Sequence, residues 1–478
     1  MLYIPDLYDN FILRHHRRNL LSKQELYSQI PQMHEIMEQL SSHNYNRSVV
    51  KYCADKVLSN LREKISEGKI DIIDKDKVIN NIMSSCENFI QGSLKKVINA
   101  TGIVIHTNLG RSPLSGDLFK KSLETVCGYS NLEYDIDAGN RGDRYHHLSE
   151  YLRYLTGAED ALILNNNAAA VFLILNTFAE NRECIVSRGE LVEIGGSFRI
   201  PEVMRKSGAR LQEVGTTNKT KITDYENAVS PETSVIMKVH KSNYIIKGFT
   251  EEPPCEQICQ LADKNDLISY YDLGSGLISD FSLKFCDEPL VKDVIDKGFD
   301  LVSFSGDKLL GGVQAGIIAG KKHLIDKLKG NQLMRMLRVD KITLSLLQNI
   351  LKEYINEDYE KIRTLRMFNE NLDSLKSRSD DLAQIINNLN PDLKLEVVQV
   401  TSFTGGGSCP MQEINSYAVQ LNTGSISEAE IEKHLREFSP PVICRTADKK
   451  IILDLRTISK EEYEDIAGGI DWAVKMSL

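Results

Sequence analysis

From about residue 93 onwards, short apolar runs alternate with stretches in which apolar residues recur every three or four positions. Short runs rich in Val, Ile and Leu are typical of strands that are buried on both faces. They lie at Ala161–Leu164, Cys184–Val186, Arg210–Val214, Val235–Val239, Leu267–Tyr271, Leu301–Phe304 and Gly316–Ala319. Because helical stretches separate them, they predict an α/β fold with a largely parallel sheet and helices on both faces.

The two ends of the chain have different patterns. Residues 1–92 have helical periodicity and few strand-like runs, which predicts an N-terminal helical domain. Residues 93–345 form the predicted large α/β domain. Residues 346–478 begin with long helical stretches and continue with short strands and helices, which predicts linker helices and a small C-terminal α+β domain.

Composition excludes several classes of protein. With 41% hydrophobic and 26% charged residues, the chain has the make-up of an ordinary globular protein. No apolar run approaches the roughly 18 residues of a membrane-spanning helix, and no signal peptide is evident, so we expect a cytoplasmic protein. Cys255 and Cys259 lie four apart without a second pair, so no metal site is expected. The net charge of −9 counts against a nucleic-acid partner, but local basic patches suffice to hold phosphates.

Polar residues follow several of the predicted strands. They are Asn165–Asn167, Ser187–Arg188, His240, Asp272 and Ser305–Lys308. In open α/β sheets, ligands bind beyond the carboxyl ends of the strands. The sequence therefore predicts a ligand site at this edge of the sheet.

Lys308 is the candidate nucleophile of this site. It follows a buried strand and precedes a glycine-rich turn, so its ammonium can be desolvated and its pKa lowered. Two nucleotide-binding motifs are incomplete in the neighbouring sequence. Lys321 lacks the following Ser or Thr of a phosphate-binding P-loop, and Gly274-Ser275-Gly276 lacks the third glycine of a dinucleotide fingerprint.

Seven segments resemble those of the bacterial L-seryl-tRNA(Sec) selenium transferases, also called selenocysteine synthases. They are INATGIVIHTNLGR at 98–111, NNNAAAV at 165–171, VSRGELVEIGGSFRIPEVM at 186–204, VGTTNKT at 214–220, DLGSGL at 272–277, SFSGDKLLGGVQAGIIAGKK at 303–322 and LRVDKITL at 337–344. The resemblance extends from about residue 28 to the end, with Val313 where the family pattern has proline. It implies a fold-type I enzyme that depends on pyridoxal 5'-phosphate (PLP).

PLP requires three anchors, and the sequence offers a candidate for each. Lys308 would form the Schiff base, and Asp272, at the end of a strand, would face the pyridine nitrogen. Ala168 and Ala169 open a helix whose backbone N–H groups suit the phosphate, and the Ser305 hydroxyl can add a further contact. Asp272 as a helix cap or turn former, and N-capping by the preceding asparagines, are the structural alternatives.

The resemblance also implies roles for residues around the cofactor. Arg111, Arg335 and Arg338 correspond to a selenophosphate pocket, and arginine forks suit such an oxyanion. Arg335 and Arg338 lie three apart, so they would share one face if this segment is helical. Arg144 and Asp307 are expected near the reacting carbon, as catalytic residues that assist loss of the serine hydroxyl.

His240 and Asn243 are expected to line the cofactor. A structural role for the histidine is an equal alternative.

The implied activity is conversion of L-seryl-tRNA(Sec) to L-selenocysteinyl-tRNA(Sec) with selenophosphate as selenium donor. Elimination of water would give an aminoacrylyl intermediate, to which selenium adds. The N-terminal domain would grip the tRNA, and the family implies a homo-oligomer, at least a dimer and in bacteria a decamer built as a pentamer of dimers. A related PLP-dependent lyase or ammonia-lyase acting on a small amino acid or sugar acid is the alternative.

Overall fold

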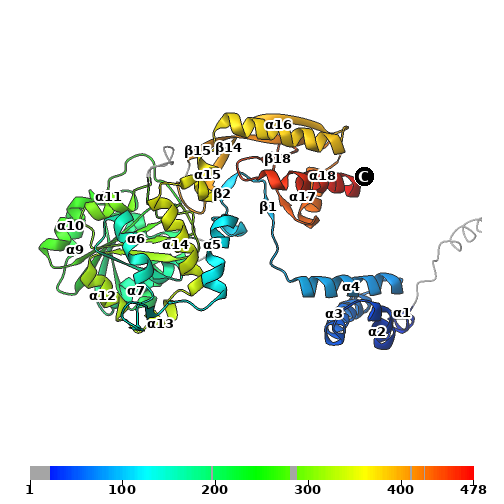
Figure 1. The fold of residues 1–478 in the computed structure, drawn as a ribbon, viewed down its shortest axis with the longest axis horizontal. Helices are drawn as coiled ribbons and strands as arrows, with labels where there is room; N and C mark the ends of the chain where they lie inside the picture. The colour runs from blue at the N-terminus through cyan, green and yellow to red at the C-terminus, as the bar shows by residue number, and fades with distance from the viewer. Residues whose placement is uncertain (1–21, 195–197, 280–287, 410–411, 425, 478) are drawn as a thin grey trace, which may run out of the picture. The chain divides into compact units, whose positions relative to one another are not determined.

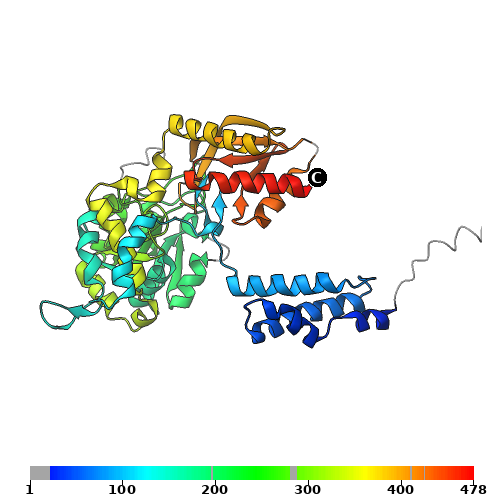
Figure 2. The same cartoon turned by 45° about the vertical axis from the view of Figure 1, so that its right-hand side comes forward.

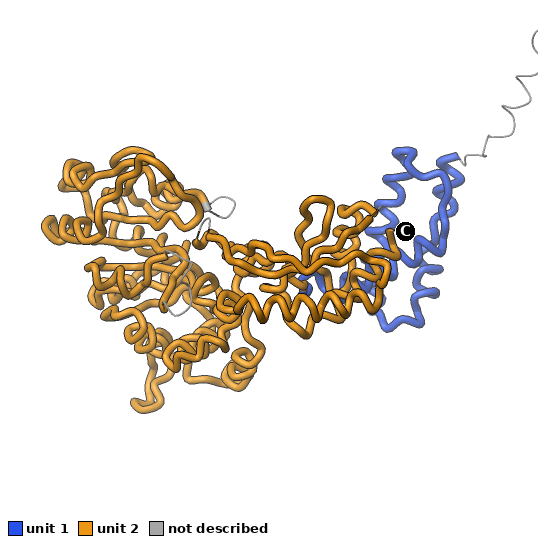
Figure 3. Tube along the Cα trace, turned by 90° about the horizontal axis from the view of Figure 1, so that it is seen from above, with its two compact units in different colours: residues 1–96 blue, residues 97–478 orange. Residues whose placement is uncertain are grey.

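The structure is a computed structural model that describes residues 22–194, 198–279, 288–409, 412–424 and 426–477. The chain forms two compact units, residues 1–96 and 97–478, which Figure 3 distinguishes by colour. Residues 1–21 of the predicted N-terminal domain lie outside the described residues. No helix in the described part is long and apolar enough to cross a membrane.

The N-terminal unit consists of helices packed around their apolar faces. Its main helices are α1 (Lys23–Gln29), α2 (Met33–Gln39), α3 (Arg47–Ser66) and α4 (Lys75–Gln91). Asn46 and Asp74 cap α3 and α4 by accepting hydrogen bonds from backbone N–H groups of the first turn. The buried core includes Ile36, Leu58 and Ile82, all fully or almost fully excluded from solvent.

A seven-stranded sheet organises the second unit (Figure 1). Its order is β5-β13-β12-β11-β10-β6-β9, and only β13 runs antiparallel to its two neighbours. The strands are β5 (Asp160–Leu164), β6 (Glu183–Ser187), β9 (Arg210–Val214), β10 (Thr233–Val239), β11 (Ile268–Gly274), β12 (Leu301–Ser305) and β13 (Gly316–Gly320). All seven predicted strands are confirmed, with ends that differ by at most a few residues.

Helices cover both faces of this sheet. Alternate strand residues face opposite sides, so Leu301 and Val302 belong to two different hydrophobic cores. One core includes side chains of α5 (Gly116–Cys127), α6 (His146–Thr156), α9 (Ile222–Ala228), α10 (Cys255–Lys264), α11 (Val291–Asp296) and α14 (Lys341–Ile355). The other includes α7 (Asn167–Ala179), α8 (Ile200–Ser207), α12 (Lys322–Lys329) and α13 (Met334–Leu337). The predicted α/β class is therefore confirmed.

A second sheet of five strands lies in the C-terminal part (Figure 2). Its order is β17-β18-β15-β14-β2. The strands are β2 (Ile103–Ile105), β14 (Lys394–Gly405), β15 (Glu413–Asn422), β17 (Arg445–Ala447) and β18 (Lys450–Asp454). Helices α16 (Leu372–Leu389), α17 (Glu428–Glu437) and α18 (Tyr463–Ser477) pack on it through one further core.

The chain reaches this second sheet from two directions. The sequence assigned residues 93–345 to the large domain, but β1 (Ile98–Asn99) pairs with β16 (Val442–Ile443), and β2 pairs with β14. Strands of two or three residues carry no readable alternation, so only their distant partners identify them. The boundary predicted at residue 345 also falls inside α14, which packs on the large sheet's helices rather than on the second sheet.

Candidate active site

Lys308 lies just beyond the carboxyl end of β12 in the centre of the large sheet. Lys308 is only 7% exposed to solvent, and its ammonium makes no hydrogen bond to the residues that the structure describes. Burial lowers the pKa of Lys308, and the nearby charge of Asp272 only partly offsets this effect. A buried amine without a partner is more readily deprotonated, which is the state that a nucleophile or a base requires.

Close backbone approach in the following turn holds Lys308 in place. The N–H of Gly306 donates to Ala315 O at 2.8 Å, and that of Gly312 donates to Gly306 O at 2.9 Å. A Cβ added at Gly306 would lie 2.6 Å from Val313 O, so a side chain there would push the turn open. The glycine-rich pattern therefore has a steric cause.

Asp272 lies on the adjacent parallel strand, β11, where it pairs with Ser303 of β12. Its Oδ1 accepts hydrogen bonds from Asn167 Nδ2 at 2.8 Å and from Gly274 N at 3.1 Å, whereas Oδ2 accepts none among the described residues. Burial raises the pKa of Asp272, opposed by the hydrogen bond from Asn167 and the charge of Lys308. The free oxygen is thus a buried acceptor that a cationic N–H group would stabilise.

His240 is held beside Asp272 by a carboxylate that the sequence did not predict. Its backbone N–H donates to Asp272 O at 2.9 Å, and its Nε2 lies 3.0 Å from Glu288 Oε2. Glu288 also accepts from Ser275 Oγ at 2.6 Å and from Cys409 N at 2.9 Å. Glu288 belongs to no recognised motif, because its contacts come from segments that are distant in sequence.

The amino-terminal end of α7 opens at the same edge of the sheet. Asn166 caps the helix, and its side chain accepts a hydrogen bond from Ala169 N at 2.9 Å. The N-capping alternative is therefore present, and it leaves the N–H groups of Asn167 and Ala168 at the positive end of the helix. Ser305 is buried and is the last residue of β12.

Arg111 is joined to the site through Asp307, the residue before Lys308. Its guanidinium donates to Asp307 Oδ2 at 2.6 Å. Arg111 also has a φ of +61°, a left-handed backbone conformation that is unfavourable for a non-glycine residue. Such strain is often retained at functional positions, where the surrounding structure maintains it.

Arg144 and Arg338 form a second cluster around Glu133. Arg144 donates to Glu133 Oε1 and to Val339 O, and Arg338 lies 3.5 Å from the same Glu133 oxygen. Hydrogen bonds from Arg144 lower the pKa of Glu133, so this carboxylate stays ionised. No contact in the described part of the chain joins this cluster to Arg111.

The condition under which Arg335 and Arg338 would share one helical face is not met. Arg335 lies in the short helix α13, but that helix ends at Leu337 and Arg338 has the extended backbone of a C-cap. Arg338 instead forms an antiparallel β-bridge with Leu164, the last residue of β5. Spacing along the sequence could not reveal this, because the β-bridge pairs Arg338 with a residue that is distant in sequence.

Comparison with known proteins decides the family. A family model described as "SelA: L-seryl-tRNA selenium transferase" matches residues 97–459. The chain belongs to the SelA family. Relatives named L-seryl-tRNA(Sec) selenium transferase are 46% identical in Aliarcobacter butzleri, 47% in Nautilia profundicola and 45% in Aquifex aeolicus. Each match covers 92% of this chain and 96% or 97% of the relative.

A solved structure of D-glucosaminate-6-phosphate ammonia-lyase shares the fold, with a TM-score of 0.57 and 19% identity. The match covers 81% of this chain and 98% of that one. The fold-type I assignment agrees with this likeness, which at such low identity concerns the fold alone.

The SelA site has the features that PLP, the cofactor of this family, requires. Lys308 provides a buried amine, Asp272 Oδ2 an open acceptor and α7 a helix end for a phosphate. Two further buried atoms, Asn167 Oδ1 and Asn243 Oδ1, have no hydrogen-bond partner among the described residues. Buried polar atoms are rarely left unpaired, so these oxygens indicate a place for a polar ligand.

Glu288→Gln should destabilise the SelA site in a pH-dependent way. Hydrogen bonding and the charge of His240 outweigh burial and lower the pKa of Glu288, so its contribution is complete above its unfolded pKa and is lost as the pH falls through the folded value. We expect a loss of about 2 kcal/mol at pH 7, measured by urea unfolding, that shrinks below about pH 4.3. Exposed Glu430→Gln is the control. A loss that stays equal over this pH range would contradict an effect of charge.

Proposed function

We propose that this chain converts L-seryl-tRNA(Sec) to L-selenocysteinyl-tRNA(Sec), with selenophosphate as the selenium donor. Its membership of the SelA family and its 45–47% identity to transferases of that name support this function. The observation that carries it is the placement of Lys308 and Asp272 at the ends of adjacent parallel strands. The lyase alternative has weaker support, because the ammonia-lyase likeness concerns the fold alone.

Lys308 and Asp272 perform the central steps of the proposed reaction. When bound, PLP supplies an electron sink for the negative charge that develops at the seryl Cα. Lys308 removes the Cα proton, and its lowered pKa favours the neutral amine that this step needs. Asp272 would present its negative charge to the pyridine nitrogen of bound PLP through Oδ2, the oxygen that accepts no hydrogen bond among the described residues.

Loss of the serine hydroxyl requires assistance, since hydroxide is a poor leaving group. We assign this role to Asp307 and Arg144. Arg111 fixes the Asp307 carboxyl group beside Lys308, and Arg144 is 9% exposed with two of its contacts on Glu133. These assignments come from the family resemblance, and the contacts support a fixed orientation for each side chain.

Arg111, Arg335 and Arg338 are the proposed ligands of selenophosphate. Arg335 makes no ion pair among the described residues, and Arg338 has only the long contact to Glu133 at 3.5 Å. Both side chains are therefore available to a more highly charged oxyanion. Because Arg111 lies in a separate cluster, a complete pocket is consistent with the shared active site of a homo-oligomer, at least a dimer.

The N-terminal unit is the proposed tRNA-binding part. Residues 1–96 contain 14 Lys and Arg against 12 Asp and Glu, a net charge of +2 in a chain whose total is −9. Local positive charge favours an RNA backbone even in an acidic protein. Double-stranded RNA is recognised mostly by shape, which suits a small helical unit with a defined surface.

The test is to incubate the full chain with seryl-tRNA(Sec) and selenophosphate, and to analyse the amino acid released from the tRNA. We expect selenocysteine on the tRNA and no turnover of free serine under the same conditions. Product formation should require selenophosphate. Turnover of free serine that is indifferent to the tRNA would instead support the lyase alternative.

A further inference from the structure

A groove runs beside helix α15 (Arg363–Asn369). Two adjoining cavities of about 470 and 490 Å³ share Glu360, Arg363, Arg366, Ser459 and Glu461. The first continues to the start of α16, and the second continues along the start of α5. We call the two together the α15 groove. None of its lining residues belongs to the active site described above.

The α15 groove is rich in cations. Its lining residues include seven basic side chains and four acidic ones. The basic side chains are Lys121, Lys361, Arg363, Arg366, Arg378, Arg456 and Lys460. The acidic ones are Asp117, Glu360, Glu370 and Glu461. The excess of positive charge stands out in a chain with a net charge of −9.

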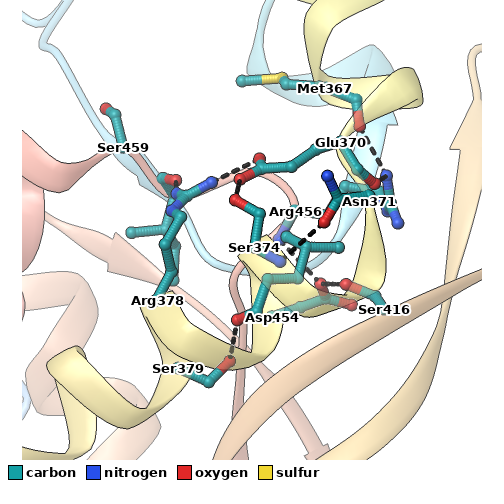
Figure 4. A network of polar contacts seen from close by, with 12 residues as sticks. Met367, Glu370, Asn371, Ser374, Arg378, Ser379, Ser416, Asp454, Arg456 and Ser459 are labelled. Carbon is teal, nitrogen blue, oxygen red and sulfur yellow. Dashed lines mark hydrogen bonds and ion pairs between the residues drawn. The ribbon is translucent and has the colours of Figure 1, made fainter.

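Arg456 is a buried cation among the lining residues of the groove, and Figure 4 shows it within a network of polar contacts. The residue is 2% exposed, and it donates to Met367 O at 2.7 Å and to Phe368 O at 3.2 Å, at the carboxyl end of α15. Burial lowers the pKa of Arg456, but a guanidinium remains charged in proteins. Its Nε has no hydrogen-bond partner among the described residues. The nearby carboxylates of Asp454 and Glu370 oppose the effect of burial on its pKa, so they offset part of the charge of Arg456.

Neighbouring contacts neutralise part of the remaining charge. Arg378 forms an ion pair with Glu370, and Ser374 donates to the same carboxylate at 2.8 Å (Figure 4). Lys121 and Lys361 both form ion pairs with Glu353, which is not a lining residue of the groove. These pairs leave Arg363 and Arg366 as the cations without a carboxylate partner on α15.

Arg363 and Arg366 lie three apart on α15, so both side chains can reach the groove. Among the described residues, the Arg363 guanidinium makes only one hydrogen bond, a long one from Nη2 to Ser459 Oγ at 3.5 Å. Its buried Nε has no hydrogen-bond partner among them. Arg366 makes no side-chain hydrogen bond or ion pair in the described part of the chain. The 18-residue helix α16 begins at the groove, with its N-cap Asn371 among the lining residues. Its positive end adds to the attraction for an anion.

We propose that the α15 groove binds phosphodiester groups of the tRNA backbone. This inference rests on the proposed function, which makes a tRNA the substrate. Two adjoining cavities suit successive phosphates of a chain better than one small anion. Contacts from arginines and helix N-termini to phosphate oxygens position a nucleic acid without reading its sequence.

Arg363→Ala and Arg366→Ala test the proposal by tRNA binding to the full chain. We measure Kd for seryl-tRNA(Sec) from 50 to about 200 mM salt. Each variant should weaken binding about tenfold at the lower salt and reduce the slope of log K against log salt by about 1. Lys376→Ala, which removes an exposed cation of α16 that does not line the groove, should leave both quantities unchanged. Thermal unfolding checks that the variants fold.

The alternatives give different results. Unchanged Kd and slope in the two single variants and in a double variant that combines Arg363→Ala with Arg366→Ala, with tight binding by the wild-type chain, would overturn the groove proposal and leave the proposed function standing. Failure of the wild-type chain to bind the tRNA would overturn both. A third arm titrates inorganic phosphate. If the double variant loses phosphate binding but keeps its tRNA affinity, the groove binds a small anion and the proposal is wrong.

Discussion

Lys308→Ala should abolish the visible absorbance of lysine-linked PLP and lower turnover of seryl-tRNA(Sec) by at least about 10³-fold. The proposed reaction uses this buried amine both to hold the cofactor and to take the Cα proton, so its removal affects both steps. Absorbance after dialysis measures cofactor retention, and product analysis measures turnover.

A second measurement does not depend on the reaction. In the cofactor-free chain, burial lowers the pKa of Lys308, so an amine reagent should modify it with a pH midpoint below the ordinary lysine value of about 10.4. Lys321→Ala is the matched control, because Lys321 follows the antiparallel strand β13 at the opposite edge of the sheet and pairs with Asp300. An absorbance band that persists in Lys308→Ala would show that another lysine holds the cofactor.

The sequence predicts the large sheet well because its strands are buried on both faces. Such strands appear as short, continuous apolar runs, and their polar ends mark the carboxyl edge where Asp272 and Lys308 lie. Neither the strand order nor the reversed direction of β13 can be read from these runs. Those depend on packing between distant segments.

Features built from distant pairings were not predictable. Glu288 binds His240, and Glu133 binds Arg144 and Arg338, yet neither glutamate stands in a recognisable motif. The pairings of β1 with β16 and of β2 with β14 were not predictable for the same reason, because these partners are distant in sequence. Local periodicity describes single elements, whereas such carboxylates and edge strands are defined by tertiary contacts.

Asp272→Asn should lower turnover by about 10²- to 10³-fold while keeping the cofactor linked to Lys308. Asparagine has nearly the same shape, so it removes the negative charge that we propose faces the pyridine nitrogen, without removing the lysine amine. The two substitutions therefore have different signatures, since Lys308→Ala loses the absorbance band and Asp272→Asn retains it. Spectra of both purified variants, recorded with their rates, separate the two roles.

The charge of Asp272 has a further consequence for Lys308. Because that charge raises the pKa of Lys308 against the effect of burial, its removal should move the pH midpoint of amine modification still lower in the cofactor-free chain. Asp300→Asn is the control. Asp300 is also buried and accepts from Ser269 N at 2.7 Å, but it precedes β12 at the opposite edge of the sheet. Asp300→Asn should reduce the stability of the protein and leave the pH midpoint of Lys308 modification unchanged. A midpoint and a rate that both stay at wild-type values in Asp272→Asn would show that this carboxylate does not act on the bound cofactor.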